Sequence, residues 1–281
     1  MLWEELTADE FAGAVDDCEG VCIITLGVLE RHLHHLPPGT DLMLGQHVAE
    51  LAARREPVVV FPPWYLGEVY EAVCFPGTVT LPPKSMVELM LAIFDEIGRN
   101  GFTKIITFLS HGGNVYLAPF LAQCQLFRQK SYQVYSLFWD QGLTEAQRAK
   151  WNAVMETDGG QHAGESETSI MMAHRPDLVK MEALDGQVAE PLGRLDHVKP
   201  GYTALWWYAD YPEHYAGDAR TASAEKGKVL TDLLVDSLAA FIRAVKNDTV
   251  TPKLAWEFFS ARGRIAKRAE IRPMKKTHRA A

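Results

Sequence analysis

Four short and nearly continuous apolar runs recur along the chain, and none carries a charge at its centre. Uninterrupted apolar runs of this length are typical of strands in a parallel sheet, which are buried on both faces. In three other segments the apolar positions repeat with the 3.6-residue period of a helix. The predicted strands are residues 21–26, 57–61, 104–109 and 133–138, and the predicted helices are residues 85–99, 114–130 and 221–246.

The order of these segments predicts the fold class. A strand, a helix and a second strand in sequence form a βαβ unit, which places helices on the face of a parallel sheet. We therefore expect an α/β fold, a three-layer αβα sandwich around a mostly parallel sheet, with ligands bound at the carboxyl ends of the strands. The length of 281 residues predicts a single domain over residues 1–250, followed by a C-terminal extension over residues 251–281.

The composition is that of an ordinary globular protein, with 47% hydrophobic and 23% charged residues. No apolar run approaches the roughly 20 residues that cross a bilayer, and the chain opens with Glu4 and Glu5 where a targeting peptide would carry basic residues. The cysteines are too few and too scattered for a disulfide framework. We expect a soluble, cytoplasmic protein with reduced cysteines and no membrane partner.

The formal net charge of −8 conceals a basic C-terminal extension. From Arg262 onward the only acidic residue in the sequence is Glu270, which stands among many lysines and arginines. A basic tail can bind nucleic acid, but here no aromatic residues interleave with the charges, which favours a solvated or subunit-docking segment. We therefore expect no nucleic-acid partner.

Potential metal ligands are concentrated in the loop that follows the first predicted strand. Carboxylate oxygen and imidazole nitrogen together suit zinc, manganese, iron or nickel, and a carboxylate such as Asp41 can bridge two ions. The Pro37-Pro38-Gly39 turn adds the rigidity that a ligand-holding loop needs. The alternative is a polar surface loop without a function. The potential ligands are Glu30, His32, His34, His35 and Asp41.

Two further loops carry a histidine beside glycines. His111 follows the third predicted strand and leads into a helix, where glycines let the backbone approach a ligand. His162 precedes Glu165 and Glu167, and its imidazole is suited to general acid or base catalysis. If a helix begins near Gly164, the two glutamates lie about 200° apart, and only one can easily face a shared site. The alternative is a capping arrangement in which the helix dipole favours the acidic side chains.

In sequence order these clusters resemble the creatininase (creatinine amidohydrolase) family. The family motif Glu-x-His-Gly-x-His-Leu-Pro-x-x-Thr-Asp matches residues 30–41 at every position except Leu33, where the family has glycine. The resemblance covers roughly residues 20–245. The further segments that match in register are Phe75-Pro76-Gly77-Thr78, His111-Gly112-Gly113-Asn114, residues 162–169, Gly217-Asp218 and residues 222–227.

The resemblance implies a dinuclear metal site. It assigns Glu30, His32 and His111 as ligands and Asp41 as the carboxylate that bridges two divalent ions. Zinc and manganese are the leading candidates, and iron and nickel are alternatives. Family members commonly assemble as homo-oligomers, with hexamers frequent, so self-association is the expected protein partnership.

The resemblance also bears on the fifth ligand and the proton-transfer groups. Creatininase takes a ligand from a glutamate at the position of Gly113, whereas other relatives take it from the segment that matches Glu167. We therefore predict Glu167 as the fifth ligand, in preference to Glu165. The predicted catalytic residues are His162 and Glu165, and His162 would donate a proton to the departing nitrogen.

Three positions depart from the family pattern, which commonly has glutamine, glycine and histidine where this chain has Arg31, Leu33 and Ala72. We expect all three near the pocket. Leu33 would change its volume, and Arg31 would add a charge able to recognise a carboxylate or phosphate. Creatinine itself is therefore not the expected substrate.

The predicted function is that of a metal-dependent amidohydrolase of the EC 3.5 class. A metal-bound hydroxide would cleave a carbon–nitrogen bond in a small cyclic amide, amide or formamide. Two alternatives stay open at this point. One is a dinuclear-metal phosphoesterase, and the other is a non-catalytic metal-binding or assembly protein in which Leu33 has closed the pocket.

Overall fold

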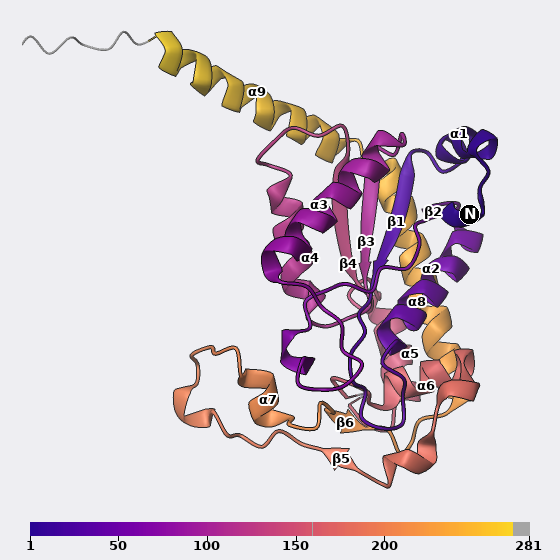
Figure 1. Ribbon diagram of the computed structural model, residues 1–281. Helices are drawn as coiled ribbons and strands as arrows, with labels where there is room; N and C mark the ends of the chain where they lie inside the picture. The colour runs from indigo at the N-terminus through magenta and orange to yellow at the C-terminus, as the bar shows by residue number, and fades with distance from the viewer. Residues whose placement is uncertain (159, 272–281) are drawn as a thin grey trace, which may run out of the picture.

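The sheet at the centre of the molecule has four parallel strands in the order β2-β1-β3-β4. The computed structural model describes residues 1–158 and 160–271 (Figure 1). β1 and β3 pair along their full length, from Val21 opposite Lys104 to Leu26 opposite Leu109. The strands are β1 (Val21–Leu26), β2 (Val59–Val60), β3 (Lys104–Leu109) and β4 (Gln133–Phe138).

The predicted strands are confirmed, and only β2 is shorter than the apolar run that predicted it. Pro57 and Pro62 stand on either side of Val59 and Val60, and proline has no N–H for a ladder hydrogen bond. β2 also lies at one end of the strand order, where its two residues pair with β1.

Helices cover both faces of the sheet, and shorter elements connect them (Figure 1). The α-helices of the described chain are α1 (Ala8–Asp17), α2 (Thr40–Arg55), α3 (Pro83–Arg99), α4 (Asn114–Cys124), α5 (Glu145–Val154), α6 (Glu165–His174), α7 (Trp206–Asp210), α8 (Ala224–Asn247) and α9 (Val250–Ile271). Its 3-10 turns are η1 (Trp3–Glu5), η2 (Tyr70–Ala72), η3 (Pro176–Leu178), η4 (Met181–Leu184) and η5 (Asp196–Val198). A small antiparallel pair consists of β5 (Val188–Ala189) and β6 (Gly217–Asp218).

The predicted helices are present, but their ends differ, and α3 begins at Pro83 rather than at residue 85. α4 ends at Cys124 rather than at residue 130. After it the N–H groups of Gln125 and Leu126 bond to carbonyls three residues back instead of four, which tightens the backbone out of the α-helical path. α8 begins at Ala224, because the side chain of Ser223 caps its first turn.

The core consists of two hydrophobic clusters, one on each face of the sheet. Val21 and Ile23 of β1 pack with residues of α2, α5 and α8, whereas Cys22 and Ile24 pack with residues of α1, α3 and α4. Successive side chains of a strand point to opposite faces, so one fully buried strand serves both clusters. This is the predicted three-layer αβα sandwich (Figure 1).

A glycine lets α8 pack closely against α6. A Cβ atom on Gly227 would lie 1.9 Å from the carbonyl oxygen of Ser169. The side-chain oxygen of Ser169 in turn accepts a hydrogen bond from the N–H of Ser223, just before α8. The first two turns of α6 are therefore fixed by α8, and these turns carry Glu165 and Glu167.

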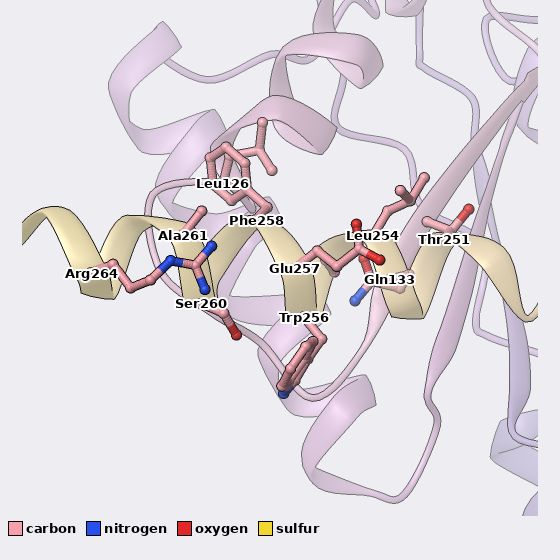
Figure 2. Close-up of a pocket in the computed structure, with 11 residues that line it drawn as sticks. Leu126, Gln133, Thr251, Leu254, Trp256, Glu257, Phe258, Ser260, Ala261 and Arg264 are labelled. Atoms are coloured by element: carbon pink, nitrogen blue, oxygen red, sulfur yellow. The ribbon is translucent and has the colours of Figure 1, made fainter.

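α9 projects away from the sandwich (Figure 1) and covers the first part of the predicted basic extension. Residues 272–281 of that extension lie outside the described residues. Trp256 and Phe258 of α9 are exposed. A pocket of about 810 Å³ is lined by residues of α9 together with Leu126 and Gln133. Figure 2 shows the side chains that line this pocket. Among the described helices, none is long and apolar enough to cross a membrane.

Candidate metal centre

Several loops and two helix starts meet at the carboxyl ends of β1 and β3. Glu30 and His32 follow β1, and His111 follows β3. Asp41 lies in the first turn of α2, and Glu167 lies in the first turn of α6. The structure therefore brings together the five side chains that the sequence analysis assigned as ligands. All but Glu167 are almost completely buried.

The carboxylate of Asp41 lies between two histidines. Its Oδ1 is 3.2 Å from Nε2 of His32, and its Oδ2 is 3.1 Å from Nδ1 of His111. The other nitrogen of His32 donates to the carbonyl oxygen of Glu30 at 3.1 Å. The other nitrogen of His111 donates to the carbonyl oxygen of Glu68 at 2.7 Å. These backbone bonds orient each ring so that its remaining nitrogen faces Asp41, as proteins do with metal-ligating histidines.

The carboxylates stabilise positive charge at both rings. Burial lowers the pKa of His32, but Asp41, Glu167 and Glu30 together outweigh burial and raise the pKa to about 9. Burial opposes protonation of His111 as well, yet Glu30 and Asp41 raise its pKa well above the ordinary value. The same field attracts a divalent cation, and protons and metal ions therefore compete for these nitrogens.

Glu30 links this pair to a third histidine that the sequence analysis did not single out. Its Oε1 is 2.8 Å from Nδ1 of His111, and its Oε2 accepts a hydrogen bond from Nε2–H of His214 at 2.6 Å. The indole N–H of Trp207 donates to Nδ1 of His214 at 3.1 Å, which leaves Nε2 as the protonated nitrogen. Oε1 of Glu30 is buried without a hydrogen-bond partner, and a cation would remove that cost.

His162 holds a free nitrogen toward the same carboxylate. Its Nε2–H donates to the carbonyl oxygen of Arg31 at 2.7 Å, and its Nδ1 is 3.7 Å from Oε1 of Glu30. Its ring centre lies 4.2 Å from that of His32. Burial is the main reason that the pKa of His162 lies well below the ordinary value. A neutral ring with a free lone pair at Nδ1 can accept a proton or bind a cation.

Glu167 and Glu165 point in different directions, as their spacing on α6 requires. Oε2 of Glu167 is 3.9 Å from Nε2 of His32 and accepts a hydrogen bond from the N–H of Ala163 at 2.6 Å. Burial is the main cause that raises the pKa of Glu167, to about 7. Glu167 therefore faces the cluster.

Glu165 is completely buried on the other side of α6. Its carboxylate accepts hydrogen bonds from the backbone of Glu156 and Thr157 and from the ammonium of Lys226 on α8. Burial opposes its ionisation, but the hydrogen bonds from Lys226, Thr157 and Glu156 together outweigh burial and lower the pKa of Glu165 to about 2. The structure does not bring Glu165 to the cluster, and the catalytic role predicted for it does not fit this placement. Its carboxylate instead ties α6 to α8 and to the segment before residue 158.

The potential ligand atoms of the cluster form groups of three that are close enough together to hold a metal ion. One potential ligand atom from each of His32, Asp41 and Glu167 lies within 4.8 Å of the other two. The same holds for Glu30, Glu71 and His111, and for Glu30, His32 and His162. Carboxylates and imidazoles in such groups are ligands that first-row divalent ions accept. The side chains of the described cluster could therefore hold a pair of divalent metal ions.

The cluster lies at the base of a pocket of about 840 Å³. The described residues that line the pocket include no lysine or arginine. Aromatic side chains from η2, α4, α7 and the loop before α7 form much of the remaining lining, namely Tyr70, Tyr116, Tyr202, Trp206, Trp207 and Tyr208. The pocket thus combines an acidic, histidine-rich base with aromatic walls.

The family model described as Creatininase: Creatinine amidohydrolase matches residues 4–242. The chain belongs to the creatininase family. The resemblance identified from the motifs is thereby confirmed. The match ends within α8, so α9 lies outside it.

Relatives within the creatininase family carry different activities. The chain is 26% identical to a 3-dehydro-scyllo-inosose hydrolase of Thermotoga maritima, over 87% of this chain and 83% of the relative. It is 26% identical to the creatinine amidohydrolase of Pseudomonas putida, over 86% of this chain and 94% of the relative. It is 28% identical to a mycofactocin precursor peptide peptidase of Mycobacterium ulcerans, over 78% of this chain and 83% of the relative. Family membership thus indicates a hydrolase without fixing the substrate.

Solved structures of the creatininase family confirm the fold. A crystal structure of creatininase superposes with a TM-score of 0.73 at 22% identity, and the match covers 88% of this chain and 98% of that one. The α/β architecture with its parallel sheet is therefore that of creatininase.

The three departures from the creatininase pattern do not line the pocket. Leu33 has a positive φ of 52°, which explains the glycine of the family motif, and its side chain packs in a cluster with Leu36 and Met171. The guanidinium of Arg31 lies 4.5 Å from the ring centre of Phe75 and bonds to Glu213 at 2.8 Å.

Ala72 is buried in a cluster with Val28 and Val69. None of Arg31, Leu33 and Ala72 therefore lines the pocket, although Ala72 directly follows the lining residue Glu71, and Leu33 does not close the pocket.

Sequence reasoning missed His214, Glu68 and Glu71, all of which line the pocket. None of the three stands beside a predicted ligand in the sequence. One signal could have found His214. It stands just before Gly217 and Asp218, which open the closing segment of the creatininase family.

Proposed function

We propose that this member of the creatininase family is a metal-dependent amidohydrolase that acts on small molecules. The observation that carries the proposal is the position of Asp41, with one carboxylate oxygen toward His32 and the other toward His111, at the base of a pocket of about 840 Å³. A carboxylate in this position can bridge two metal ions.

Two divalent ions would be held by the five residues predicted as ligands. Glu30 and His111 would hold one ion, and His32 and Glu167 would hold the other, with Asp41 shared between them. Such ions lower the pKa of a bound water and polarise a carbonyl oxygen. The mixed oxygen and nitrogen donors suit zinc and manganese. Solved creatininase structures include a Zn-Zn type and a manganese form, which supports this choice.

His162 is the group best placed to move a proton. Its Nδ1 faces the cluster with a free lone pair, because its Nε2–H is held by the carbonyl oxygen of Arg31. Cleavage of an amide requires a proton on the departing nitrogen, since an amide anion is a poor leaving group. His162 accepts a proton at Nδ1 from the attacking water and delivers it to that nitrogen.

His214 positions Glu30 for this chemistry. Because its Nε2–H occupies Oε2 of Glu30, the second oxygen is directed toward His111 and His162. Trp207 fixes the tautomer of His214 and also lines the pocket, so it connects the wall of the pocket to the ligand.

A carbon–nitrogen bond is the proposed target because two relatives act on such bonds. They are the creatinine amidohydrolase and the peptide peptidase. A creatininase variant has also been solved in complex with creatine, a small molecule of the size this pocket accommodates. Small cyclic amides, linear amides and formamides are the proposed substrate classes. Self-association of the chain stays a prediction.

The pocket disfavours the two alternative functions. A phosphoesterase commonly neutralises its substrate with arginine or lysine, and neither is present among the described residues of the lining. A non-catalytic metal-binding protein would close or fill its pocket, whereas Leu33 packs elsewhere and the pocket is open.

The test compares metal-loaded protein with protein stripped by a chelator, on a panel of lactams, cyclic ureas, formamides and short peptides. We expect amide turnover in the loaded protein, and its loss in the stripped protein and in His111→Ala. Aryl phosphate esters in the same panel test the phosphoesterase alternative. A protein that holds two metal ions per chain and cleaves no amide in this panel would overturn the proposal.

A further inference from the structure

One ligand-sized side chain at the base of the pocket has no assigned role. Glu71 belongs to η2, and one of its carboxylate oxygens lies within 4.8 Å of a ligand atom of Glu30 and of His111. No hydrogen bond or ion pair within the described chain engages the carboxylate of Glu71. Glu30, which belongs to the same group of potential ligands, is almost completely buried, and its Oε1 lacks a hydrogen-bond partner. The carboxylate of Glu71 therefore shares one group of potential ligand atoms with Glu30 and His111, whose Oε1 and Nδ1 atoms lie 2.8 Å apart.

The neighbours of Glu71 hold it in place. The hydroxyl of Tyr70 donates to the carbonyl oxygen of Leu81 at 3.1 Å, and Ala72 is completely buried. The carbonyl oxygen of Ala72 accepts from the hydroxyl of Thr78 at 2.8 Å. With both adjacent residues fixed, the loop presents Glu71 to the pocket without further ordering, which is what a preorganised ligand needs.

The backbone on this side of His111 leaves no room for a ligand from the glycine pair that follows it. A Cβ atom on Gly113 would lie 2.3 Å from the carbonyl oxygen of Glu68 and 2.5 Å from its carboxylate. Glu68 thus fills the space that a side chain at position 113 would occupy. Position 113 therefore cannot supply a carboxylate ligand, whereas the segment that contains Glu68 also carries Glu71.

We propose that Glu71 is a ligand of the metal ion held by Glu30 and His111. The inference rests on the proposed dinuclear centre and adds one donor to it. That ion then has three carboxylates and one imidazole, counting the shared Asp41. An oxygen-rich set of this kind favours a harder ion such as manganese at this position over the other.

The experiment measures binding of Mn²⁺ to chelator-stripped full-length protein by titration calorimetry, and metal content by elemental analysis after dialysis. The matched pair is Glu71→Gln and Glu68→Gln, because both change a carboxylate of the same segment that lines the pocket. We expect two ions per chain in the unmodified protein and in Glu68→Gln. In Glu71→Gln we expect one ion to be retained and the other to bind at least tenfold more weakly. The electron paramagnetic resonance signal of coupled Mn²⁺ ions should disappear from the same variant.

Each other outcome has a distinct meaning. Two ions bound by Glu71→Gln with unchanged affinity would refute the role of Glu71 and leave the dinuclear centre intact. An unmodified protein that binds no ion would instead refute the proposed function. Without metal, the unmodified protein and Glu71→Gln should have the same Tm, since the carboxylate of Glu71 has no hydrogen-bond partner to lose. A lower Tm of metal-free Glu71→Gln would reveal a structural role and overturn the inference. Glu71→Asp, which withdraws the carboxylate by one methylene, should bind the second ion with intermediate affinity.

Discussion

His214 donates its Nε2–H to Oε2 of Glu30 at 2.6 Å, across 184 positions of the chain. Glu30 leaves the sheet after β1, whereas His214 comes from the loop between α7 and β6. The backbone of His214 has a positive φ of 53°, which is uncommon outside glycine. Because His214 contacts a proposed ligand, this uncommon conformation indicates that the hydrogen bond to Glu30 holds the loop in place.

His214→Ala is therefore expected to weaken metal binding by about 10–100-fold, the usual effect of removing a group that orients a ligand. Trp207→Phe keeps the ring bulk but removes the N–H that fixes the tautomer, so its loss of affinity should be smaller. Both affinities can be measured by competition with a coloured chelator. Unchanged affinity in His214→Ala would contradict a positioning role.

Leu33→Gly restores the residue of the family motif and tests what the leucine does here. Glycine relieves a positive φ that costs a side chain about 1 kcal/mol, but removing a buried leucine costs about 2–5 kcal/mol. The net expectation is a lower free energy of unfolding, measured with urea. Leu33→Ala loses the packing and keeps the strain, so it should be the less stable of the two.

Because Leu33 does not line the pocket, amide turnover per metal-loaded molecule should stay unchanged in both variants. A change in substrate preference with unchanged stability would show instead that the leucine reaches the substrate.

The strands and most of the proposed ligands were predictable from the sequence because their signals are local. An apolar run identifies a buried strand, and parallel strands bring their carboxyl ends to one edge of the sheet. Glu30 and His32 follow β1, and His111 follows β3, so they could be placed without tertiary information. Helix geometry indicated that only one of Glu165 and Glu167 faces the site. It could not show that Glu165 is the one turned away, because its partner Lys226 lies 61 residues further along the chain.

Arg31 shows where local reasoning could have gone further. It stands between Glu30 and His32, and in an extended segment adjacent side chains point to opposite sides. A position between two ligands in such a segment thus argues against a place in the pocket. Glu71 comes close to His111 through tertiary packing, in which Glu68 lies against Gly113.

Acid should destabilise the packing of α2 against α6 through a histidine pair remote from the cluster. The rings of His47 and His174 stack at 3.7 Å. Burial is the main cause that lowers the pKa of His47, to about 4, and burial also lowers the pKa of His174. A folded-state pKa below that of the unfolded chain means that the unfolded chain binds more protons. Stability is therefore lost as pH falls from about 6.5 toward 4, by at most about 1.4 kcal/mol per pH unit for each histidine.

The measurement is the free energy of unfolding of metal-free protein between pH 7.5 and 4.5, for the unmodified chain and for His47→Gln. The decline with falling pH should be shallower in the variant, since one of the two groups no longer titrates. Parallel curves would show that the pair does not contribute to the acid response.

The last prediction concerns the contact that positions α6. Alanine at position 227 would place a methyl group 1.9 Å from the carbonyl oxygen of Ser169, which is backbone and cannot rotate away. Where an added methyl group meets no neighbour, replacing glycine by alanine within a helix stabilises the fold by up to about 1 kcal/mol. Gly13→Ala in α1 is therefore the matched control, because nothing lies within 4 Å of a Cβ atom at that position. Overpacking reverses the sign, and we expect Gly227→Ala to lower the free energy of unfolding by about 1–3 kcal/mol in urea.

The displacement should also reach the proposed metal centre. Ser169 lies two positions after Glu167 on α6, so a shift of this helix moves a proposed ligand away from His32 and Asp41. Gly227→Ala should therefore weaken binding of one ion more than the other, in addition to its effect on stability. If stability falls and both ions bind as in the unmodified chain, α6 has tilted without moving its first turn, and Glu167 is held by its bond to the N–H of Ala163 rather than by α8.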